Sequence, residues 1–240
     1  MNTKTSLFAA LICLFSYSLG AQGLGEFFSK TDAFMQAYVT DGKVAYQRLH
    51  NDATALDAVL ALAKDIQVDK THAADYQAFW INAYNLAVIK GIVSNYPIKS
   101  PLDKAGFFDK QTYSLAGKEI TLNDIENKLL RANFPTEARF HFVLVCAGLG
   151  CPPIVSHAYT PDRLEDQLQQ QTVSALNDPN FIRVKGKKVQ ISQLFEWYKG
   201  DFTQNGKSEL DFINAYRNEK IDAKAKVGYY AYDWRLNETK

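Results

Sequence analysis

The chain has 240 residues, of which 47% are hydrophobic and 22% are charged. These proportions are typical of a globular protein and exclude the collagen-like, coiled-coil and disordered classes. Lys plus Arg is 27 and Asp plus Glu is 26, a net charge of +1 that argues against a broad electrostatic footprint for nucleic acid or an anionic membrane. Three cysteines are too few for a disulfide scaffold.

Residues 1–21 have the features of a secretory signal peptide. Lys4 gives a positive start, Leu7 to Leu19 form an uncharged apolar stretch, and small residues follow up to Ala21. A single transmembrane anchor is the alternative, but it needs about 20 apolar residues, more than this stretch has. We therefore predict export to the periplasm or the medium, no stable membrane insertion, and a single domain over residues 22–240.

Apolar spacing and capping residues predict a mainly helical chain. The expected helices, in chain order, run from Leu24 to Tyr38, after Asp52, from Thr71 to Val93, after Thr121, from Thr160 to Leu176, after Ser192, and from Leu210 to Tyr216. Two hairpins are expected, one over Thr112 to Ile120 and one over Phe181 to Ile191. The apolar run Phe140 to Val145 predicts a strand covered on both faces. The pattern predicts one α+β domain, with helices packed around a small antiparallel sheet.

The segment RFHFVLVCAGLGCPPI, residues 139–154, is the most informative for function. It places Cys146 and Cys151 on one loop after the predicted strand, a position that reactive groups often occupy. A thiol is nucleophilic only as its thiolate, and His141 is the candidate base, although strand alternation would put it on the face opposite Cys146. A structural disulfide between the two cysteines is the other interpretation.

Other chemistries fit this loop less well. No second close Cys/His pair accompanies the cysteines, so we expect no metal site. A redox-cycling pair is usually Cys-x-x-Cys, whereas four residues separate these two cysteines. The chain also lacks phosphate-loop, dinucleotide-binding, H-E-x-x-H and G-x-S-x-G motifs, and we expect no cofactor.

Three further polar residues are candidates for the site. Asn82 and Asn85, in AFWINAYNL, share one face of a predicted helix. Buried carboxamides need hydrogen-bond partners, so these two either tie the helix to neighbouring backbone, which their residue type favours, or orient a catalytic imidazole or donate to an oxyanion. Glu126 lies on a half-apolar helix, where it could pair with Arg131 or orient His141.

Five ordered segments, AFWINAYNLAVI, TLNDIENKLLR, RFHFVLVCAGLGCPPI, LFEWYKGDF and YAYDWRLN, closely resemble the bacterial domain-of-unknown-function family numbered 547. The resemblance runs from about Phe34 to Asn237. The family's helix often reads Ile-Glu-His, and Asn127 stands here in place of that histidine. The family is similar to papain- and transglutaminase-like folds, which act on amides through a thiolate and an imidazole, although fold alone does not fix function.

That resemblance implies Cys146 as the nucleophile and His141 as the base, with Glu126, Asn82 or Asn85 orienting the imidazole. Cys151 would be a resolving cysteine, or would protect Cys146 in a disulfide. The implied protein is a cysteine-dependent hydrolase or transferase acting on peptide or amide bonds, or on a small thiol such as glutathione. The alternative is a non-catalytic binding or structural domain stapled by a Cys146–Cys151 disulfide.

Overall fold

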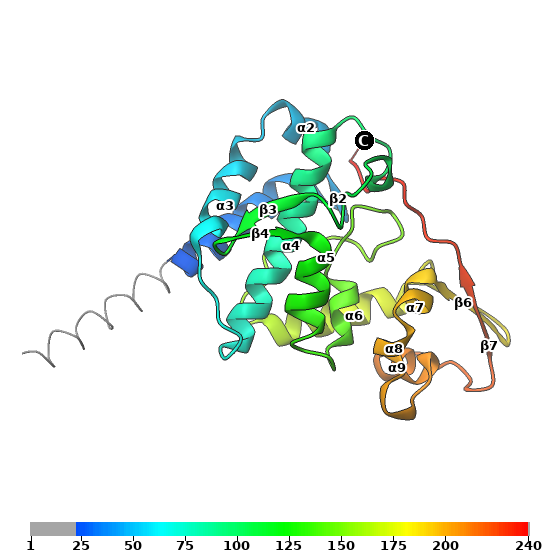
Figure 1. Ribbon diagram of the computed structural model, residues 1–240. Coiled ribbons are helices and arrows are strands. Elements are labelled where there is room, and N and C mark those ends of the chain that lie inside the picture. Colours follow the sequence, from blue (N-terminus) through cyan, green and yellow to red (C-terminus); the bar gives the residue numbers. More distant parts are fainter. Residues whose placement is uncertain (1–22, 240) are drawn as a thin grey trace, which may run out of the picture.

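The computed structural model describes residues 23–239, in which helices predominate (Figure 1). The predicted signal peptide, residues 1–21, lies outside the described residues. The chain is helical over residues 23–38 and then in α2 (Tyr46–Asn51), α3 (Thr54–Asp65), α4 (Ala73–Asn95), α5 (Leu122–Asp124), α6 (Leu164–Asn177), α7 (Gln193–Trp197), α8 (Lys199–Phe202) and α9 (Glu209–Tyr216). Shorter helical turns are η1 (Pro101–Asp103), the π-helical η2 (Ile125–Arg131), η3 (Ala138–Phe142) and η4 (Gln204–Gly206). Between residues 23 and 239, no helix combines the length and the apolar composition that a membrane crossing requires.

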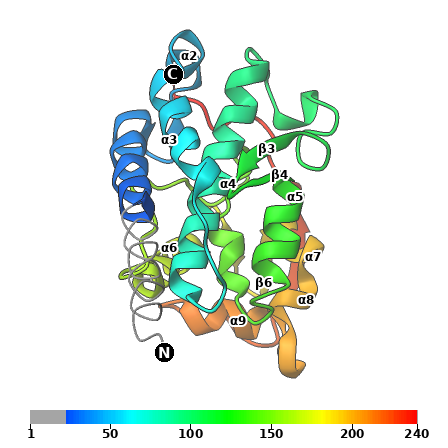
Figure 2. The same cartoon turned by 60° about the vertical axis from the view of Figure 1, so that its left-hand side comes forward.

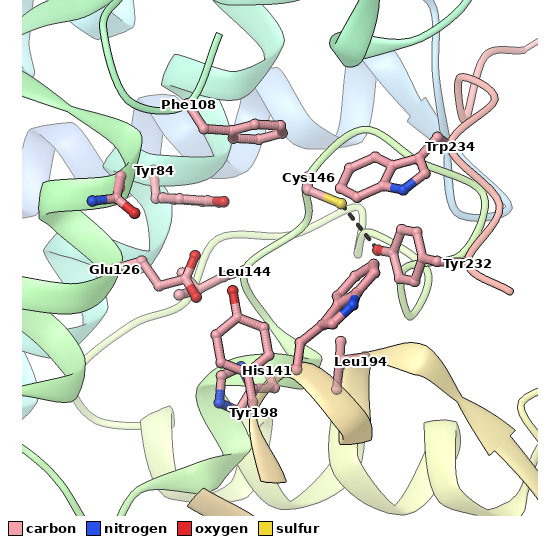
Figure 3. A pocket seen from close by; sticks show the side chains of 12 residues that line it. Tyr84, Phe108, Glu126, His141, Leu144, Cys146, Leu194, Tyr198, Tyr232 and Trp234 are labelled. Carbon is pink, nitrogen blue, oxygen red and sulfur yellow. Dashed lines mark hydrogen bonds between the residues drawn. The ribbon is translucent and has the colours of Figure 1, made fainter. Parts of the chain in front are cut away.

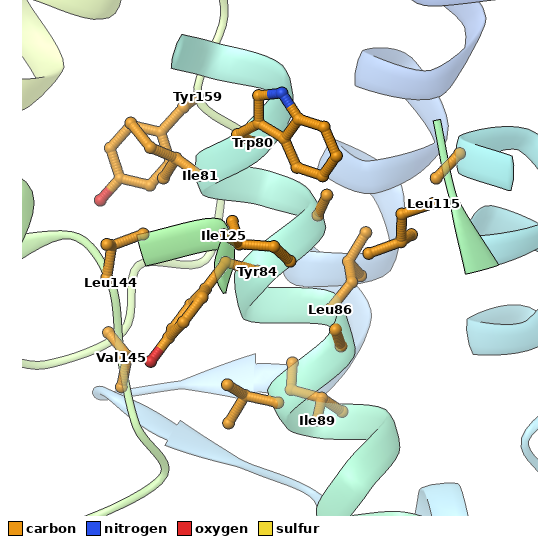
Figure 4. Packing of buried hydrophobic residues seen from close by; sticks show 14 of the residues in the cluster. Trp80, Ile81, Tyr84, Leu86, Ile89, Leu115, Ile125, Leu144, Val145 and Tyr159 are labelled. Carbon is orange, nitrogen blue, oxygen red and sulfur yellow. The ribbon is translucent and has the colours of Figure 1, made fainter. Parts of the chain in front are cut away.

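Helix α4 is the centre of the larger core. It is buried on nearly all sides, from Tyr76 to Val93, because its apolar residues surround the axis instead of forming one stripe. α2, α3 and η2 pack against it, and the view in Figure 2 shows α4 between α3 and α5. Figure 4 shows the result: side chains of α4 such as Trp80 and Ile89 meet Leu115, Ile125 and Val145 from distant parts of the chain.

Within residues 23–239, the strands form three small sheets. Two are hairpins, β1 (Val39–Thr40) with β2 (Lys43–Val44) and β3 (Thr112–Leu115) with β4 (Lys118–Thr121). In the third, β5 (Ile182–Lys185) and β6 (Lys188–Ser192) form a hairpin, and β7 (Lys226–Tyr230) pairs in parallel with β6. Both hairpins expected from the sequence are therefore present, and the fold class is α+β, as predicted. The helices do not surround one sheet, because the three sheets lie at separate places in the chain.

The expected strand over Phe140 to Val145 is wrong. The run begins in η3 and continues as an irregular segment that is buried but pairs with no strand. Phe140 packs into the core around α4, whereas Phe142 packs into a second core formed by the β5–β6 hairpin and the last helices. Continuous hydrophobicity signals burial on both sides, and here two cores supply that burial without a sheet. The segment thus joins the two cores and leads directly to Cys146.

Candidate functional site

Two asparagines of α4 hold the backbone that surrounds the cysteine loop. Asn85 Nδ2 donates to Val143 O at 2.9 Å, and Asn85 Oδ1 accepts from Val145 N, also at 2.9 Å. Asn82 makes the same pair of contacts with one residue, donating to Tyr159 O at 2.7 Å and accepting from Tyr159 N at 3.0 Å. Each carboxamide therefore supplies one donor and one acceptor to the backbone, as a neighbouring strand would. Both asparagines tie α4 to neighbouring backbone, which is the role that their residue type favoured.

The cysteine loop is closed on its other side by the C-terminal segment. Leu149 N donates to Arg235 O at 2.8 Å, and Gly150 N donates to Asp233 O, also at 2.8 Å. This approach requires glycine, because a Cβ at Gly150 would lie 2.8 Å from the backbone nitrogen of Asp233. The segment also carries Tyr232 and Trp234 to the loop. The site is thus assembled from α4, the loop and the chain terminus.

Cys146 and Cys151 are free thiols in direct contact. Their Sγ atoms are 2.7 Å apart, and the Tyr232 hydroxyl lies 3.0 Å from Cys146 Sγ and 2.8 Å from Cys151 Sγ. The backbone N–H of Cys146 also donates to Cys151 Sγ at 3.0 Å. No disulfide joins the two sulfurs in the described structure.

The two thiols differ in acidity. The hydrogen bond to Cys151, together with burial, raises the pKa of Cys146 well above its usual value. Burial also opposes ionisation of Cys151, but hydrogen bonds from the side chains of Cys146 and Tyr232 and from the backbone outweigh it and lower the pKa of Cys151. Burial raises the pKa of Tyr232, so its phenol stays protonated and can donate. The first negative charge on the pair therefore resides on Cys151.

Cys146 opens onto a cavity of about 310 Å³ (Figure 3). Its walls are mainly aromatic and apolar, with a few polar groups. The lining residues are Tyr84, Phe108, Asn123, Glu126, His141, Leu144, Cys146, Leu194, Trp197, Tyr198, Tyr232 and Trp234. A concave apolar site with a few converging polar groups is the usual form of a small-molecule site. Of the predicted site residues, Cys146, His141 and Glu126 meet here, whereas Asn82, Asn85 and Cys151 do not line the cavity.

His141 lines this cavity but makes no hydrogen bond to Cys146 in the described structure. Its Nε2 lies 2.7 Å from Asp201 Oδ2, and Arg131 binds the same carboxylate through Nε at 2.7 Å. Burial disfavours the charged form of Asp201, but hydrogen bonds from His141 and Arg131 overcome it and hold its pKa well below the usual range. Because Asp201 is an acceptor, Nε2 of a neutral His141 must carry the proton, which leaves Nδ1 as the basic nitrogen.

Asp201 therefore orients His141, the role for which Glu126, Asn82 and Asn85 were candidates. Asn127, which stands in place of the family's histidine, bonds through its side chain to Arg131. It thereby extends the network that fixes His141 instead of entering the cavity. Sequence reasoning did not select Asp201 or Tyr232, although both lie within segments that carried the family resemblance, LFEWYKGDF and YAYDWRLN.

Glu126 reaches the cavity from η2, between Tyr84 and Tyr198 (Figure 3). Burial, followed by the charge of Glu126 and a hydrogen bond to it, raises the pKa of Tyr198. Arg131, the expected partner of Glu126, makes its charged hydrogen bonds to Asp201 instead. Within residues 23–239, no group of three or more His, Cys, Asp or Glu side chains is placed to hold a metal ion.

Residues 68–174 match the model of a family described as protein of unknown function, DUF547. This segment is a DUF547 domain. It contains all six residues that the sequence predicted for the site, Asn82, Asn85, Glu126, His141, Cys146 and Cys151. The DUF547 match ends before Asp201 and Tyr232, so the chain completes the site with residues beyond it. No curated protein and no solved structure matches the chain.

Proposed function

We propose that this protein is a cysteine-dependent hydrolase or transferase that forms a covalent intermediate on Cys146. The observation that carries the proposal is the free Cys146 thiol on the wall of the cavity, 2.7 Å from a second thiol of lower pKa. Its substrates are peptides or other amides, or a small thiol such as glutathione. The papain-like relationship implied by the resemblance agrees with this chemistry, but the contacts of the two sulfurs are the stronger support.

The contacts of the two sulfurs and of His141 support the following proton transfers for such a reaction. As Cys146 Sγ bonds to the substrate carbonyl carbon, its proton passes to the Cys151 thiolate. Cys151 then gives that proton to the departing amine as the carbon–nitrogen bond breaks, which leaves a thioester on Cys146. Water or another acceptor attacks the thioester, His141 Nδ1 takes the proton of the attacking group, and that proton returns to the Cys146 sulfur on release. Each proton and leaving group is thereby accounted for.

Labelling of the native, reduced protein with iodoacetamide tests the reactive thiol. We expect Cys151, whose pKa is lowered, to be alkylated first at near-neutral pH and Cys146 more slowly, and we expect Cys146→Ala to abolish release of a fluorescent amine from a library of peptide amides. Cys151→Ser should slow release while leaving Cys146 able to form the intermediate. A Cys146 that stays unmodified in the reduced native protein would contradict the proposal.

The alternative is a non-catalytic binding or structural domain in which Cys146 and Cys151 form a staple. The contact between the two sulfurs is the observation that favours it. It requires a mass two hydrogens below that of the reduced chain, and a lower stability after reduction. Intact-mass measurement of purified protein, with and without prior reduction and alkylation, distinguishes the two functions. Two alkylated thiols without reduction would exclude the staple.

We also propose that the protein works outside the cytoplasm, as its N-terminal sequence predicts. The expected mature chain begins close to residue 22. Cell fractionation followed by N-terminal sequencing of the isolated protein tests this location. An intact Met1 in the cytoplasmic fraction would contradict it.

A further inference from the structure

The lining residues of the cavity include one carboxylate and no Lys or Arg, and His141 is the residue among them with a basic nitrogen. Glu126 supplies the carboxylate, and neither Lys nor Arg reaches the walls. No ion pair to Glu126 occurs among the described residues. A carboxylate in a mostly apolar cavity is costly to desolvate unless a positive charge accompanies it. The walls therefore favour a ligand that brings its own positive charge.

Arg131 lies near Glu126, whose charge adds to the effect of Asp201 in raising the pKa of Arg131, but its hydrogen bonds go to other groups. Its Nε and Nη2 bind the Asp201 carboxylate at 2.7 and 3.0 Å. Its guanidinium carbon also lies 4.8 Å from the centre of the Tyr198 ring. His141 covers the same ring at a centroid distance of 4.1 Å. Tyr198 offers its hydroxyl to Glu126, whereas Arg131 makes its hydrogen bonds to Asp201 and Asn127 and forms no ion pair with Glu126 among the described residues.

Aromatic rings form the opposite side of the cavity, as Figure 3 shows. Trp234 stands at the centre of this group, with Tyr232 at a ring-centroid distance of 4.8 Å, Trp197 at 5.9 Å and Phe108 at 6.2 Å. Trp197 is 47% exposed and so lies at the cavity mouth. Electron-rich ring faces attract ammonium groups, and Trp is the strongest such partner. The carboxylate and the rings thus favour the same kind of ligand from two sides.

We propose that this cavity binds a cationic amine, with its ammonium group between the Glu126 carboxylate and the ring faces of Trp197, Tyr232 and Trp234. For the chemistry, this inference rests on the proposed function: the substrate would carry both an ammonium group and the carbonyl that Cys146 attacks. The binding itself does not depend on a reactive thiol. A cationic ligand should therefore bind more tightly than a neutral ligand of the same shape.

Binding of choline, followed by the fluorescence of the tryptophans in the full chain, tests this site. The comparison ligand is the uncharged isostere of choline, in which a quaternary carbon replaces the nitrogen. We expect choline to bind the wild type about tenfold more tightly than its isostere, and we expect Glu126→Gln to remove about that tenfold preference. Glu196→Gln, which removes an exposed carboxylate outside the cavity, is the matched control and should leave choline binding unchanged.

Equal binding of choline and its isostere to the wild type would overturn the proposal, as would unchanged choline binding in Glu126→Gln with the protein folded. Circular dichroism of both variants establishes that they are folded. Cys146→Ala should bind choline like the wild type, which separates this test from that of the proposed function. Choline binding with an unreactive Cys146 would support the cation site and contradict the proposed enzyme. A reactive Cys146 without choline binding would contradict the cation site and leave the proposed enzyme intact.

Discussion

The two asparagines of α4 and the groups around the cavity are both polar and both enclosed, yet they are partnered differently. Asn82 and Asn85 are 0% and 1% exposed, and each carboxamide meets a backbone N–H and a backbone C=O. Cys146 and Glu126 instead face a cavity, and their partners are a second thiol and tyrosine hydroxyls. The first pair is matched to groups that cannot change, whereas the second pair can exchange a proton or meet a ligand.

This difference shows which buried polar groups maintain a fold and which remain available for chemistry. A buried amide with backbone partners lowers the free energy of the native state and has little capacity left to bind a ligand or transfer a proton. A thiol in contact with a second thiol can instead exchange a proton with it. If this distinction holds, substitutions in the two regions should alter different measured quantities.

The largest expected effect is on stability, at Asn85. Asn85→Ala should lower the free energy of unfolding by about 3 kcal/mol, because Val143 C=O and Val145 N–H would be left buried without partners. Chemical denaturation of the reduced protein measures it. Asn95→Ala is the matched control, since Asn95 is half-buried and bonds only to Gly91 O of its own helix, and it should cost less than about 1 kcal/mol. Equal losses in the two variants would show that the backbone pairing is unimportant.

A smaller loss is expected at the His141 network. Asp201→Asn should cost about 2 kcal/mol at neutral pH, because the carboxylate accepts charged or strong hydrogen bonds from His141 and Arg131. The pKa of Asp201 is lowered in the folded protein, so its contribution is complete above the unfolded value near ~4 and is lost as pH falls toward the folded value. The difference between wild type and variant should therefore shrink below about pH 4.

The control for Asp201 is Asp57→Asn, which removes an exposed pairing with Lys90. That pair should contribute less than about 1 kcal/mol at neutral pH. Unfolding curves between acidic and neutral pH record both variants against the wild type. A constant difference for Asp201→Asn across this range would contradict a role for its charge.

The smallest effect should appear at Tyr232 and should concern acidity instead of stability. Tyr232→Phe removes the hydroxyl beside both sulfurs but keeps the ring, so the pH midpoint for alkylation of Cys151 should rise by about one unit. Mass spectrometry of alkylated peptides over a pH series measures this midpoint. Tyr230→Phe is the control, because that hydroxyl bonds to Phe181 O, away from the thiols. An unmoved midpoint in Tyr232→Phe would mean that the phenol does not stabilise the thiolate.

Structural features that depend only on neighbouring residues could be predicted from the sequence. The β3–β4 hairpin follows from its turn, where Ala116 and Gly117 have φ values of 50° and 71°, a conformation that such short turns require. Thr121 and Ser192 cap the helices that follow them, as expected, because the cap depends on residues within one turn.

Features that depend on distant residues were not predictable in the same way. The segment before Cys146 was expected to be a strand because nothing in its own residues reveals that Asn85, 58 residues earlier, provides its hydrogen bonds. His141 and Cys146 are five residues apart in the sequence and line one cavity, but Asp201 lies 60 residues from His141 and Tyr232 lies 86 residues from Cys146. Only folding brings such partners together, so sequence spacing could indicate the thiols and not their environment.

Because Tyr232 lies far beyond Cys146 in the sequence, it is synthesised well after both cysteines. A ribosome adds about 5–20 residues per second, so the 86 residues between Cys146 and Tyr232 take on the order of ten seconds to synthesise. During that interval the nascent chain already contains both cysteines, but it has neither the phenol nor the backbone segment that closes their loop. The dithiol therefore matures late, and a chain truncated before Tyr232 would present two thiols without the wall of the cavity.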